Sequence, residues 1–267
     1  MPAVDALFVG NAIMDVFGSC DDTFLTTHEI EKGSMTLVDE ARALTLYNAM
    51  SGAQEQSGGS AANSAFGFAM LGGSAAFSGK LADDEVGNSF VANLRSGNVQ
   101  FTGTIAADGP ASARSMIFVT PDAQRSMNTY LGASLTMTDA SIQDDITAKF
   151  IYLEGYLFDA PDGPAIFAKA AQLALETRAA LSLTLSDSWC VERHKDALST
   201  FIRDHVSILF SNQDEIQALL GTDDDDTIAS FAREIDELIV TKGATGADIW
   251  RRGEKTSVSA SLQGPVI

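Results

Sequence analysis

The stretch FIYLEGYLFDAPDGPAIFAKAAQLALETRAALSLTLSD, residues 150–187, decides the fold class of this chain. It predicts an apolar strand over 150–155, a helix over 163–179 and a second apolar strand over 180–187. Short apolar runs on both sides of a helix are typical of buried parallel strands that are joined by a helical crossover. We therefore expect a strand–helix–strand unit of a parallel sheet in this part of the chain.

The same alternation extends towards both ends of the sequence. The run ALFVG at 6–10 predicts a strand, and residues 60–71 place one apolar stripe on a helix, formed by Ala61, Ala62, Ala65, Phe66, Ala69 and Met70. The remaining elements are helices over 84–95, about 190–205, 213–221 and 227–236, and strands over 207–212 and 237–242. This order predicts an α/β protein whose mostly parallel sheet is covered by helices on both faces.

Two regions depart from the alternation. Residues 33–39 have the pattern of a short exposed strand, and residues 112–120 and 125–131 flank the turn PDAQ. Proline at the second turn position with aspartate after it suits a type I turn, so the two flanking segments predict a β-hairpin. Strands that lie outside an alternating core indicate a small β lid on an α/β body.

The length of the chain limits its domain organisation. A chain of 267 residues is long enough for one large α/β domain with a sizeable core. We expect a single domain over 1–267, with lid strands from about 11–50 and 100–133. The run DDDD at 223–226 is explained as the acidic first turn of a helix, where negative charge is favoured by the helix dipole.

The charge of the chain excludes several classes of partner. The sequence has 36 acidic and 17 basic residues, which gives a net charge of −19 and a pI near 4.3. Nucleic-acid binding requires a basic surface that displaces counterions from phosphate groups, and anionic membranes attract the same kind of surface. We therefore expect no nucleic-acid partner and no membrane partner, whereas a small anionic ligand needs only one local positive site.

The rest of the composition bears on location and chemistry. The N-terminus lacks a signal-peptide pattern, and no stretch approaches the ~20 apolar residues of a membrane helix. Cys20 and Cys190 lie far apart, and we expect them to be reduced thiols of a cytoplasmic protein. The three histidines show no HExxH spacing and no GxSxG is present, so zinc-enzyme and hydrolase functions are disfavoured.

Two segments near the N-terminus could bind a polyhydroxylated ligand. SGGSAAN at 57–63 leads two glycines into a helix N-terminus with its backbone N–H groups, and Asn63 adds a side chain that donates and accepts. Asp15 in GNAIMD follows the first predicted strand, where ligands bind in open α/β sheets. An ordinary glycine turn and a solvated loop aspartate explain these residues equally well when each segment is taken alone.

Three features later in the chain could contact a nucleotide. NQDE at 212–215 forms a capping box that needs no ligand, although the same groups could hold the water shell of Mg²⁺. TKGATG at 241–246 could contact a nucleotide or simply turn into the strand ADIWRR. Arg125 opens the second hairpin strand and could bind phosphate or form a surface ion pair, and Arg114 is a weaker alternative.

Taken in order, these segments resemble the ribokinase-type (PfkB) family of sugar and nucleoside kinases, and within it the adenosine kinase-like branch. GNAIMD is similar to the substrate-aspartate segment, SGGSAANSA to the first signature, NQDE to the NxxE motif and VTKGATG to the nucleotide-binding strand end. GKLADDEVG at 79–87 is similar to G-x-V-G-x-D-x-x-G, with Ala82 in place of a usual glycine. The resemblance implies a three-layer α/β/α fold with a mostly parallel sheet and a small β lid.

The resemblance also implies an activity, which is transfer of the γ-phosphate of ATP to a primary alcohol of a nucleoside, adenosine first, or of a sugar. The residues that would bind the substrate hydroxyls are Asp15, Gly58, Gly59 and Asn63. Arg125 would approach the transferred phosphate from the lid. The residues that would organise Mg²⁺ through water are Asn212 and Glu215, and those that would border ATP are Thr241, Gly243 and Gly246. Exposed lid strands are compatible with a homodimer through the lid.

One departure from the family pattern concerns the catalytic base. The second signature, roughly D-T-x-G-A-G-D, normally follows a segment like SLQGPVI, and the sequence stops there at Ile267. We therefore expect the base to lie after Ile267, in a C-terminal part of the fold that is missing from this chain. The alternative is a non-catalytic nucleoside- or sugar-binding protein of the same fold. A nucleotide-binding oxidoreductase is disfavoured because no GxGxxG follows the first predicted strand.

Overall fold

The computed structural model describes residues 3–261, and the chain divides into two compact units. Of the described residues, unit 1 takes in 3–7 and 144–261, and unit 2 takes in 8–143. Strands alternate with helices in both, so the predicted α/β class is confirmed. Among the described residues, no helix has the length and the apolar character needed to cross a membrane.

Unit 1 is built on a mostly parallel sheet, with the strand order β16-β15-β14-β13-β12-β11-β1. The bounds are β1 Ala3–Val9, β11 Thr147–Glu154, β12 Ala180–Thr184, β13 Ile208–Asn212, β14 Glu237–Thr241, β15 Ala247–Arg251 and β16 Glu254–Val258. Neighbours from β11 to β14 pair in parallel, and β15 and β16 add antiparallel strands at one edge. The strands predicted at 6–10, 150–155, 207–212 and 237–242 are therefore confirmed.

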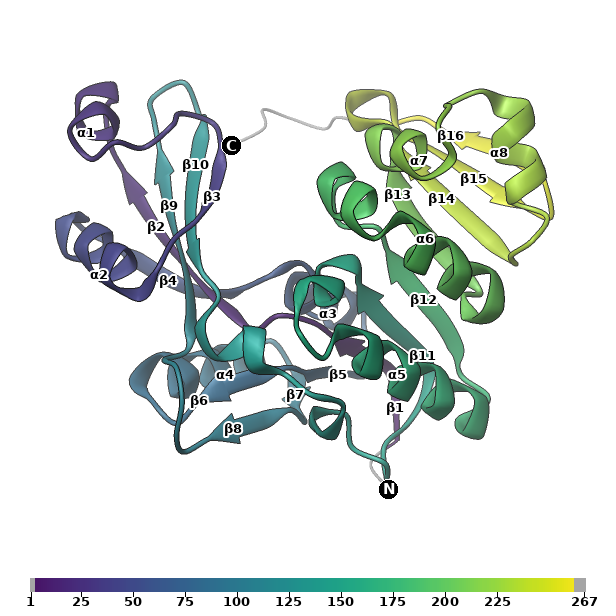
Figure 1. Cartoon of the computed structure of the whole chain (residues 1–267), viewed down its shortest axis with the longest axis horizontal. Coiled ribbons are helices and arrows are strands. Elements are labelled where there is room, and N and C mark those ends of the chain that lie inside the picture. Colours follow the sequence, from purple (N-terminus) through teal and green to yellow (C-terminus); the bar gives the residue numbers. More distant parts are fainter. Residues whose placement is uncertain (1–2, 262–267) are drawn as a thin grey trace. The chain divides into compact units, whose positions relative to one another are not determined.

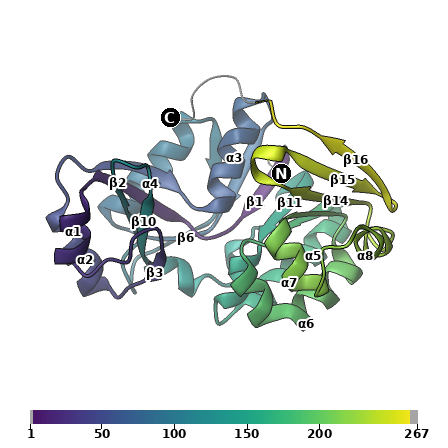
Figure 2. The same cartoon turned by 90° about the horizontal axis from the view of Figure 1, so that it is seen from above.

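Local signals explain where the helices of unit 1 begin. These helices are α5 Gly163–Thr177, α6 Ser188–His205, α7 Gln213–Leu220 and α8 Asp225–Phe231. Pro164 stands in the first turn of α5, where its missing N–H costs nothing. Asp224 caps α8 by accepting the Thr227 N–H at 2.9 Å, so the aspartate run begins a helix as predicted. Figures 1 and 2 show α5 and α6 on the same side of β11 and β12.

Two predicted elements of unit 1 are shorter than expected, and one helix contains a break. The helix expected over 227–236 begins at Asp225 and ends at Phe231. The strand expected over 180–187 ends at Thr184, because Ser186 turns the chain with a left-handed φ of 77° and Asp187 then caps α6. The α6 helix has non-helical backbone angles at His194. His194 Nε2 lies 2.7 Å from Asp159 Oδ1, and Arg193 Nη2 donates to Asp159 Oδ2 at 2.6 Å. A shared partner for two successive side chains accounts for the break in the helix.

Unit 2 contains a five-stranded sheet in the order β3-β10-β9-β2-β4. Its strands are β2 Ile13–Ser19, β3 Met35–Leu37, β4 Gln54–Gly58, β9 Ala113–Val119 and β10 Arg125–Tyr130. Two helices, α1 Asp22–Thr27 and α2 Glu40–Ala49, cover one face, where Leu25 and Leu46 pack against Met116 and Phe118 of β9. Figure 1 shows both helices on that side of the sheet.

Unit 2 also contains two longer helices, two pairs of parallel strands and two short helices. They are α3 Ser60–Met70, α4 Glu85–Ser96, the parallel pair β5 Ala75–Ser78 and β7 Val99–Phe101, the parallel pair β6 Lys80–Ala82 and β8 Thr104–Ala106, and the short helices Gly132–Thr136 and Asp139–Ser141. In the segment similar to G-x-V-G-x-D-x-x-G, Asp84 caps α4 through the Gly87 N–H at 2.7 Å and accepts the Ser112 N–H at 2.9 Å. This aspartate therefore joins the start of α4 to the start of β9.

The predicted hairpin is confirmed as β9 and β10, which pair antiparallel. Its turn closes through a hydrogen bond from the Ala123 N–H to the Thr120 carbonyl at 2.8 Å, which places Pro121 at the second turn position. Ala123 adopts a φ of 63°, and Thr120 N–H then reaches the Gln124 carbonyl at 3.1 Å. A turn followed by one left-handed residue is the common geometry of a three-residue hairpin loop.

The predicted apolar stripe of α3 is buried at the start of the helix and exposed at its end. Ala61, Ala62 and Ala65 are buried, but Met70 is 82% exposed. The helix ends at Met70 and Leu71 is its C-cap, so the last turn of the stripe extends beyond the elements that bury the first. Periodicity alone does not indicate where a helix leaves its packing partners.

Truncating one buried leucine tests the packing described for unit 2. Leu94 in α4 is fully buried, so Leu94→Ala is expected to lower the free energy of unfolding by about 2–5 kcal/mol because it leaves a cavity. The matched control is Leu175→Ala in α5, whose side chain is 82% exposed, with an expected change within about 0.5 kcal/mol. Urea denaturation followed by circular dichroism measures both, and equal effects would contradict this packing.

Candidate functional site

Asp15 in β2 is a half-buried carboxylate with no hydrogen bond or ion pair to any described residue. It occupies the space above Gly58 of the neighbouring strand, where a Cβ would lie 2.1 Å from Asp15 Oδ2. Burial raises the pKa of Asp15 to about 6. A desolvated carboxylate without a protein partner is an acceptor for donors that a ligand brings.

Gly59 and Asn63 lie next to this carboxylate along the chain. Gly59 is the N-cap of α3 with a φ of 87°, and a Cβ on it would lie 2.5 Å from the Asn11 carbonyl oxygen. Only glycine fits that close approach in that conformation. The Asn63 N–H donates to the Gly59 carbonyl at 3.0 Å in the first turn, and the Asn63 side chain is exposed and makes no hydrogen bond to a described residue.

The register of the sheet places further polar groups in line with Asp15. Gln56, Asp15, Ser115 and Thr129 pair directly across β4, β2, β9 and β10, so their side chains share one face of the sheet. The hydroxyls of Ser115 and Thr129 lie 2.9 Å apart. This face is opposite the one that α1 and α2 cover, and we call it the open face of the sheet.

Apolar side chains flank the polar row on the open face. Ile13 and Phe17 stand two residues before and after Asp15 in β2, and Ile117 stands two residues after Ser115 in β9, so alternation puts all three on the same face. Ile13 and Phe17 are half-buried, and Ile117 is buried. The open face therefore combines one unpartnered carboxylate with an apolar surround.

Arg125 lies at the start of β10, on the open face and four residues from Thr129. At ~3.4 Å per residue it is ~13 Å from the row that contains Asp15. The Arg125 side chain is exposed and forms no ion pair with a described residue, so the surface-ion-pair explanation is not supported there. Arg114, the weaker alternative, lies on the covered face with its guanidinium 4.8 Å from the centre of the Tyr47 ring.

In unit 1, the capping box at 212–215 forms as predicted. Asn212 Oδ1 accepts the Glu215 N–H at 2.8 Å, and Glu215 Oε2 accepts the Asn212 N–H at 3.0 Å. Asn212 Nδ2 also donates to Glu215 Oε1 at 2.7 Å. Glu215 is 5% exposed, and its burial raises its pKa, although the Asn212 N–H opposes that shift. The box explains the local geometry, and each carboxylate oxygen still has a lone pair for another donor.

The predicted nucleotide-bordering residues lie directly beside this box. Thr241 pairs with Asn212 across β13 and β14, and its hydroxyl donates to the Ser211 carbonyl at 3.3 Å. The short helix Gly243–Thr245 follows, with Gly243 at a φ of 55° and no atom within 4 Å of the Cβ position. Gly246 has a φ of 113° and packs against the Val258 carbonyl. The structure therefore brings Asn212, Glu215, Thr241 and both glycines together at one edge of the sheet of unit 1.

The donors at this edge fit a magnesium nucleotide. Mg²⁺ is bound by oxygen ligands such as carboxylates and amide carbonyls, and it keeps several of its waters when it binds. Within residues 3–261, no three His, Cys, Asp or Glu side chains gather as a direct metal cage, so any such ion would bind through water. Gly243 leaves open space beside the backbone, which is what a ligand at this strand end requires.

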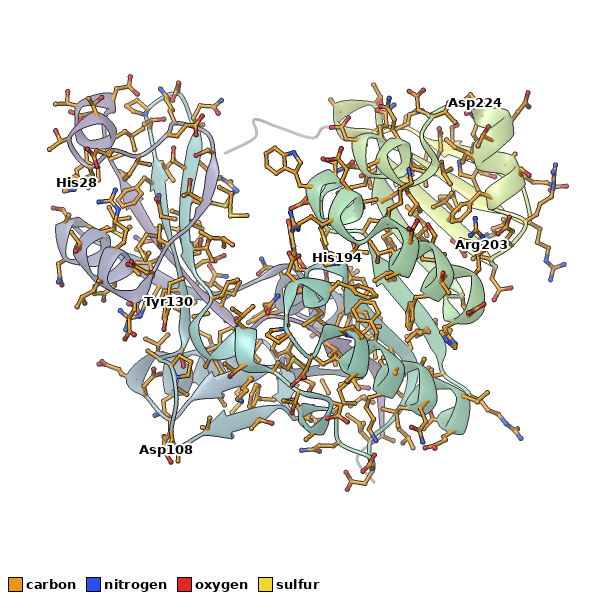
Figure 3. The ribbon with its side chains drawn as sticks, viewed as in Figure 1. His28, Asp108, Tyr130, His194, Arg203 and Asp224 are labelled. Atoms are coloured by element: carbon orange, nitrogen blue, oxygen red, sulfur yellow. The ribbon has the colours of Figure 1, made fainter. Side chains whose placement is uncertain are left out.

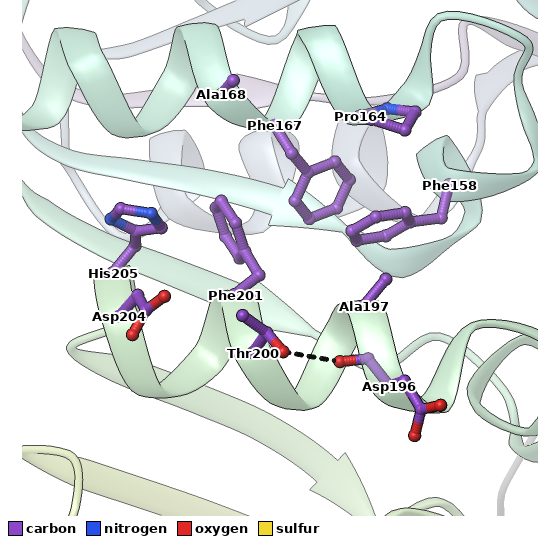
Figure 4. A pocket seen from close by; sticks show the side chains of 10 residues that line it. All are labelled: Phe158, Pro164, Phe167, Ala168, Asp196, Ala197, Thr200, Phe201, Asp204 and His205. Atoms are coloured by element: carbon purple, nitrogen blue, oxygen red, sulfur yellow. Dashed lines mark hydrogen bonds between the residues drawn. The ribbon is translucent and has the colours of Figure 1, made fainter.

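Other clusters and cavities lie apart from the predicted residues. Figure 3 places His28 at the end of α1 and His194 in α6, in different units. A cavity of about 460 Å³ lies between α5 and α6 in unit 1, and none of the predicted site residues lines it. Figure 4 shows its floor, formed by Phe158, Phe167 and Phe201, which also pack on one another in the core. The expected signature after Ile267 and the segment 262–267 lie outside the described residues.

Residues that the sequence patterns did not single out also lie at both places. Ser115 and Thr129 join Asp15 only through strand register, which short motifs do not contain. Lys242 lies inside TKGATG, and its ammonium is 2.9 Å from the buried Asp248. The ion pair of Lys242 and Asp248 could have been suspected from the sequence, because an aspartate at an inward position of the strand ADIWRR is unusual unless it is paired.

Replacing Asp15 tests whether this carboxylate destabilises the ligand-free protein. Its folded-state pKa of about 6 lies above the ordinary aspartate pKa of 3.8, so ionisation costs stability progressively as pH rises between those values and fully above them. Asp15→Asn is therefore expected to raise the free energy of unfolding by about 1–2 kcal/mol at pH 7.5, after allowance for solvent screening, and by nothing below about pH 4. Melting curves against pH measure this, with Asp108→Asn on the surface of unit 2 as control. A stability loss at pH 7.5 would contradict the assignment.

Comparison with known proteins places this architecture in a family. The family model described as pfkB family carbohydrate kinase matches residues 35–263. The crystal structure of adenosine kinase from Sinorhizobium meliloti is 40% identical, with a TM-score of 0.89 over 99% of this chain and 82% of that one. A probable sugar kinase from Rhizobium etli CFN 42 is 40% identical, with a TM-score of 0.88 over 97% and 80%.

A curated relative gives a further reference for length. Fructokinase-1 of Oryza sativa subsp. japonica is 30% identical over 212 residues, which are 75% of this chain and 65% of the relative. The chain thus matches slightly less than two thirds of the length of that relative. The family model covers most of the chain, and two solved structures with 40% sequence identity share its fold. The chain belongs to the pfkB family of carbohydrate kinases.

Proposed function

We propose that this protein transfers the γ-phosphate of ATP, with Mg²⁺, to a primary alcohol of a nucleoside, with adenosine as the first candidate. The observation that carries the proposal is Asp15, a half-buried carboxylate beside Gly58 that has no partner among residues 3–261. A ribose offers two neighbouring hydroxyls, and an ionised carboxylate with two oxygens accepts from both. The 40% identity to an adenosine kinase supports adenosine, and the fructokinase relative makes a sugar the second acceptor to test.

The surroundings of Asp15 favour a nucleoside over a free sugar. Ile13, Phe17 and Ile117 flank the polar row on the open face, and a nucleobase is a flat group that gains by leaving water for such a surface. A free sugar would leave the exposed parts of Ile13 and Phe17 without an apolar partner, whereas Ile117 is already buried. Ligand pockets commonly combine an apolar lining with a few polar groups that fix orientation, which is the composition found here.

Each remaining predicted residue has a role in the proposed transfer. Gly58 and Gly59 keep side chains away from the hydroxyls that Asp15 accepts, and Asn63 supplies a further donor and acceptor. Arg125 would bind the transferred phosphate. Thr241, Gly243 and Gly246 would border ATP, and Asn212 and Glu215 would accept hydrogen bonds from waters of Mg²⁺. The ion, when bound, offsets the negative charge of the phosphate groups. We assign no residue among 3–261 as the base.

The assembly and the location of the protein are also proposals. The edge strand β3 exposes Met35 and Leu37, at 40% and 59%, and an exposed edge of this kind supports a homodimer through the five-stranded sheet. Cys20 and Cys190 are both free thiols, and burial raises the pKa of Cys190 to about 12. Free, unreactive cysteines are typical of a reducing compartment, which supports a cytoplasmic location.

Acceptor kinetics test the role of Asp15. Release of ADP by the full-length protein, which includes the expected base, is measured with adenosine, guanosine, inosine, fructose and ribose, and adenosine is expected to give the highest kcat/KM. Because the ionised carboxylate accepts the hydroxyls, KM for adenosine is expected to fall as pH rises through about 6. Asp15→Asn is expected to raise that KM by about 10–100-fold, the value of hydrogen bonds to a charged group. No turnover on any acceptor, or an unchanged KM in Asp15→Asn, would overturn the proposal.

A second substitution separates capping from metal binding. Glutamine serves in a capping box as glutamate does, so Glu215→Gln is expected to keep the reciprocal backbone hydrogen bonds while it removes the charge. A glutamine amide has one acceptor oxygen, so the bond from Asn212 Nδ2 is lost and the melting temperature is expected to fall slightly. If Glu215 organises Mg²⁺ through water, the Mg²⁺ concentration for half-maximal activity is expected to rise about tenfold or more. Asp224→Asn, at the cap of α8, is the control that should leave this concentration unchanged. An unchanged Mg²⁺ dependence in Glu215→Gln would leave capping as its whole role.

A further inference from the structure

The hairpin after the loop Thr241–Gly246 contains a buried carboxylate that the proposed function does not use. Asp248 lies in β15, and its side chain is 9% exposed. Asp248 Oδ2 is 2.9 Å from Lys242 Nζ, and Asp248 Oδ1 accepts from the Ser257 hydroxyl at 2.6 Å. Burial opposes ionisation, but the hydrogen bonds from Ser257 and Lys242 outweigh it and lower the pKa of Asp248. The carboxylate is therefore ionised at neutral pH.

The backbone around Lys242 is held as firmly as its side chain. The Lys242 N–H donates to the Gly246 carbonyl at 2.8 Å, and the Lys242 carbonyl accepts both the N–H and the hydroxyl of Thr245, at 3.2 and 2.7 Å. Gly246 packs against β16 so closely that a Cβ would lie 1.9 Å from the Val258 carbonyl oxygen. With its main chain and its ammonium both fixed, Lys242 has one defined position beside the loop.

Stability alone gives a weak reason for this pair. Removing a carboxylate and an ammonium from water costs about as much as their attraction returns, so a buried pair adds little net stability. The other end of the β14–β15 hairpin has an ordinary surface pair, in which Arg251 is 70% exposed and binds Glu237 at 3.1 Å. The hairpin is thus tied by an ion pair at each end, and at the loop end the carboxylate of Asp248 is buried while Lys242 stays partly exposed. Lys255 Nζ lies farther from the same carboxylate, 3.8 Å from Asp248 Oδ2.

We propose that Asp248 is a positioning residue that holds the Lys242 ammonium for an anionic group of the nucleotide. An ammonium has three donors, and Asp248 is the one described partner within hydrogen-bond reach of Nζ, so two donors stay available. The Lys242 side chain is 29% exposed, so it remains open to a ligand on one side. In a chain with a net charge of −19, a phosphate needs such a local cation. This inference rests on the proposed function, because it requires that a nucleotide binds at this loop.

Calorimetric titration of ATP with Mg²⁺, and separately of adenosine, tests the inference. Asp248→Asn is expected to weaken ATP binding about tenfold, because the ammonium loses its charged anchor, and to leave the affinity of the acceptor site for adenosine unchanged. Lys242→Met is expected to give a similar loss, and the double variant no more than the larger single loss, since the two residues act as one unit. Raising the salt concentration should weaken ATP binding more steeply in the wild type than in Lys242→Met.

Glu237→Gln is the matched control, because it breaks the surface pair at the far end of the same hairpin and should not change either affinity. A wild type that binds no ATP overturns the proposed function together with this inference. A wild type that binds ATP with the same affinity as Asp248→Asn overturns the positioning role alone. Equal losses for ATP and adenosine in Asp248→Asn, with a lower melting temperature, overturn it as well, because they indicate a purely structural residue.

Discussion

In unit 1, the parallel pairing of β11 to β14 is the constraint on which the candidate nucleotide site depends. Parallel strands end at the same edge of the sheet, so Asn212 and Thr241 finish side by side although they are far apart in sequence. Glu154 and Thr184 pair at the same edge, where β12 ends opposite Phe210, two residues before the end of β13. The pairing of Asn212 with Thr241 then sets the capping box of α7 against the glycine loop. Without this register, NQDE would be a helix cap and TKGATG a turn, and neither would be near the other.

In unit 2, the candidate site depends on the burial of the Asp15 carboxylate, which no hydrogen bond from a described residue offsets. Gly58 leaves room for the Asp15 carboxylate, the sheet removes it from water, and the described residues supply no donor in return. A protein optimised for stability alone would fill that space with an apolar side chain. Strain or desolvation of this kind persists where a ligand relieves it, which supports the substrate-binding role that we propose for Asp15. Ser115 and Thr129 lie in register with Asp15 on the neighbouring strands, so the polar surface continues across the sheet.

Much of this arrangement could be predicted from the sequence, and the parts that could not have physical causes. The alternation of 150–187 predicted the fold class because the periods of strand and helix are local properties. Asp15 was singled out by its place after the first predicted strand, but the structure places it within β2 and not in a loop, and its binding role stays a prediction. The end of β12 was mispredicted, since a left-handed Ser186 leaves no compositional trace. The exposure of Met70 was missed because burial depends on the neighbour of a helix, and the buried pair of Lys242 and Asp248 was missed because hydrogen bonds across a hairpin require its register.

The alternation of elements, the family signatures and the chemical type of each candidate group follow from local sequence. They do so because backbone preference, helix capping and side-chain chemistry act over a few residues. Only the tertiary structure decided which groups meet and in what state. It placed Asp15 over Gly58 and in line with Ser115, withdrew Asp248 from water beside Lys242, and left Arg125 without an ion-pair partner among the described residues. These properties depend on strand register and on desolvation, which arise when distant segments pack together.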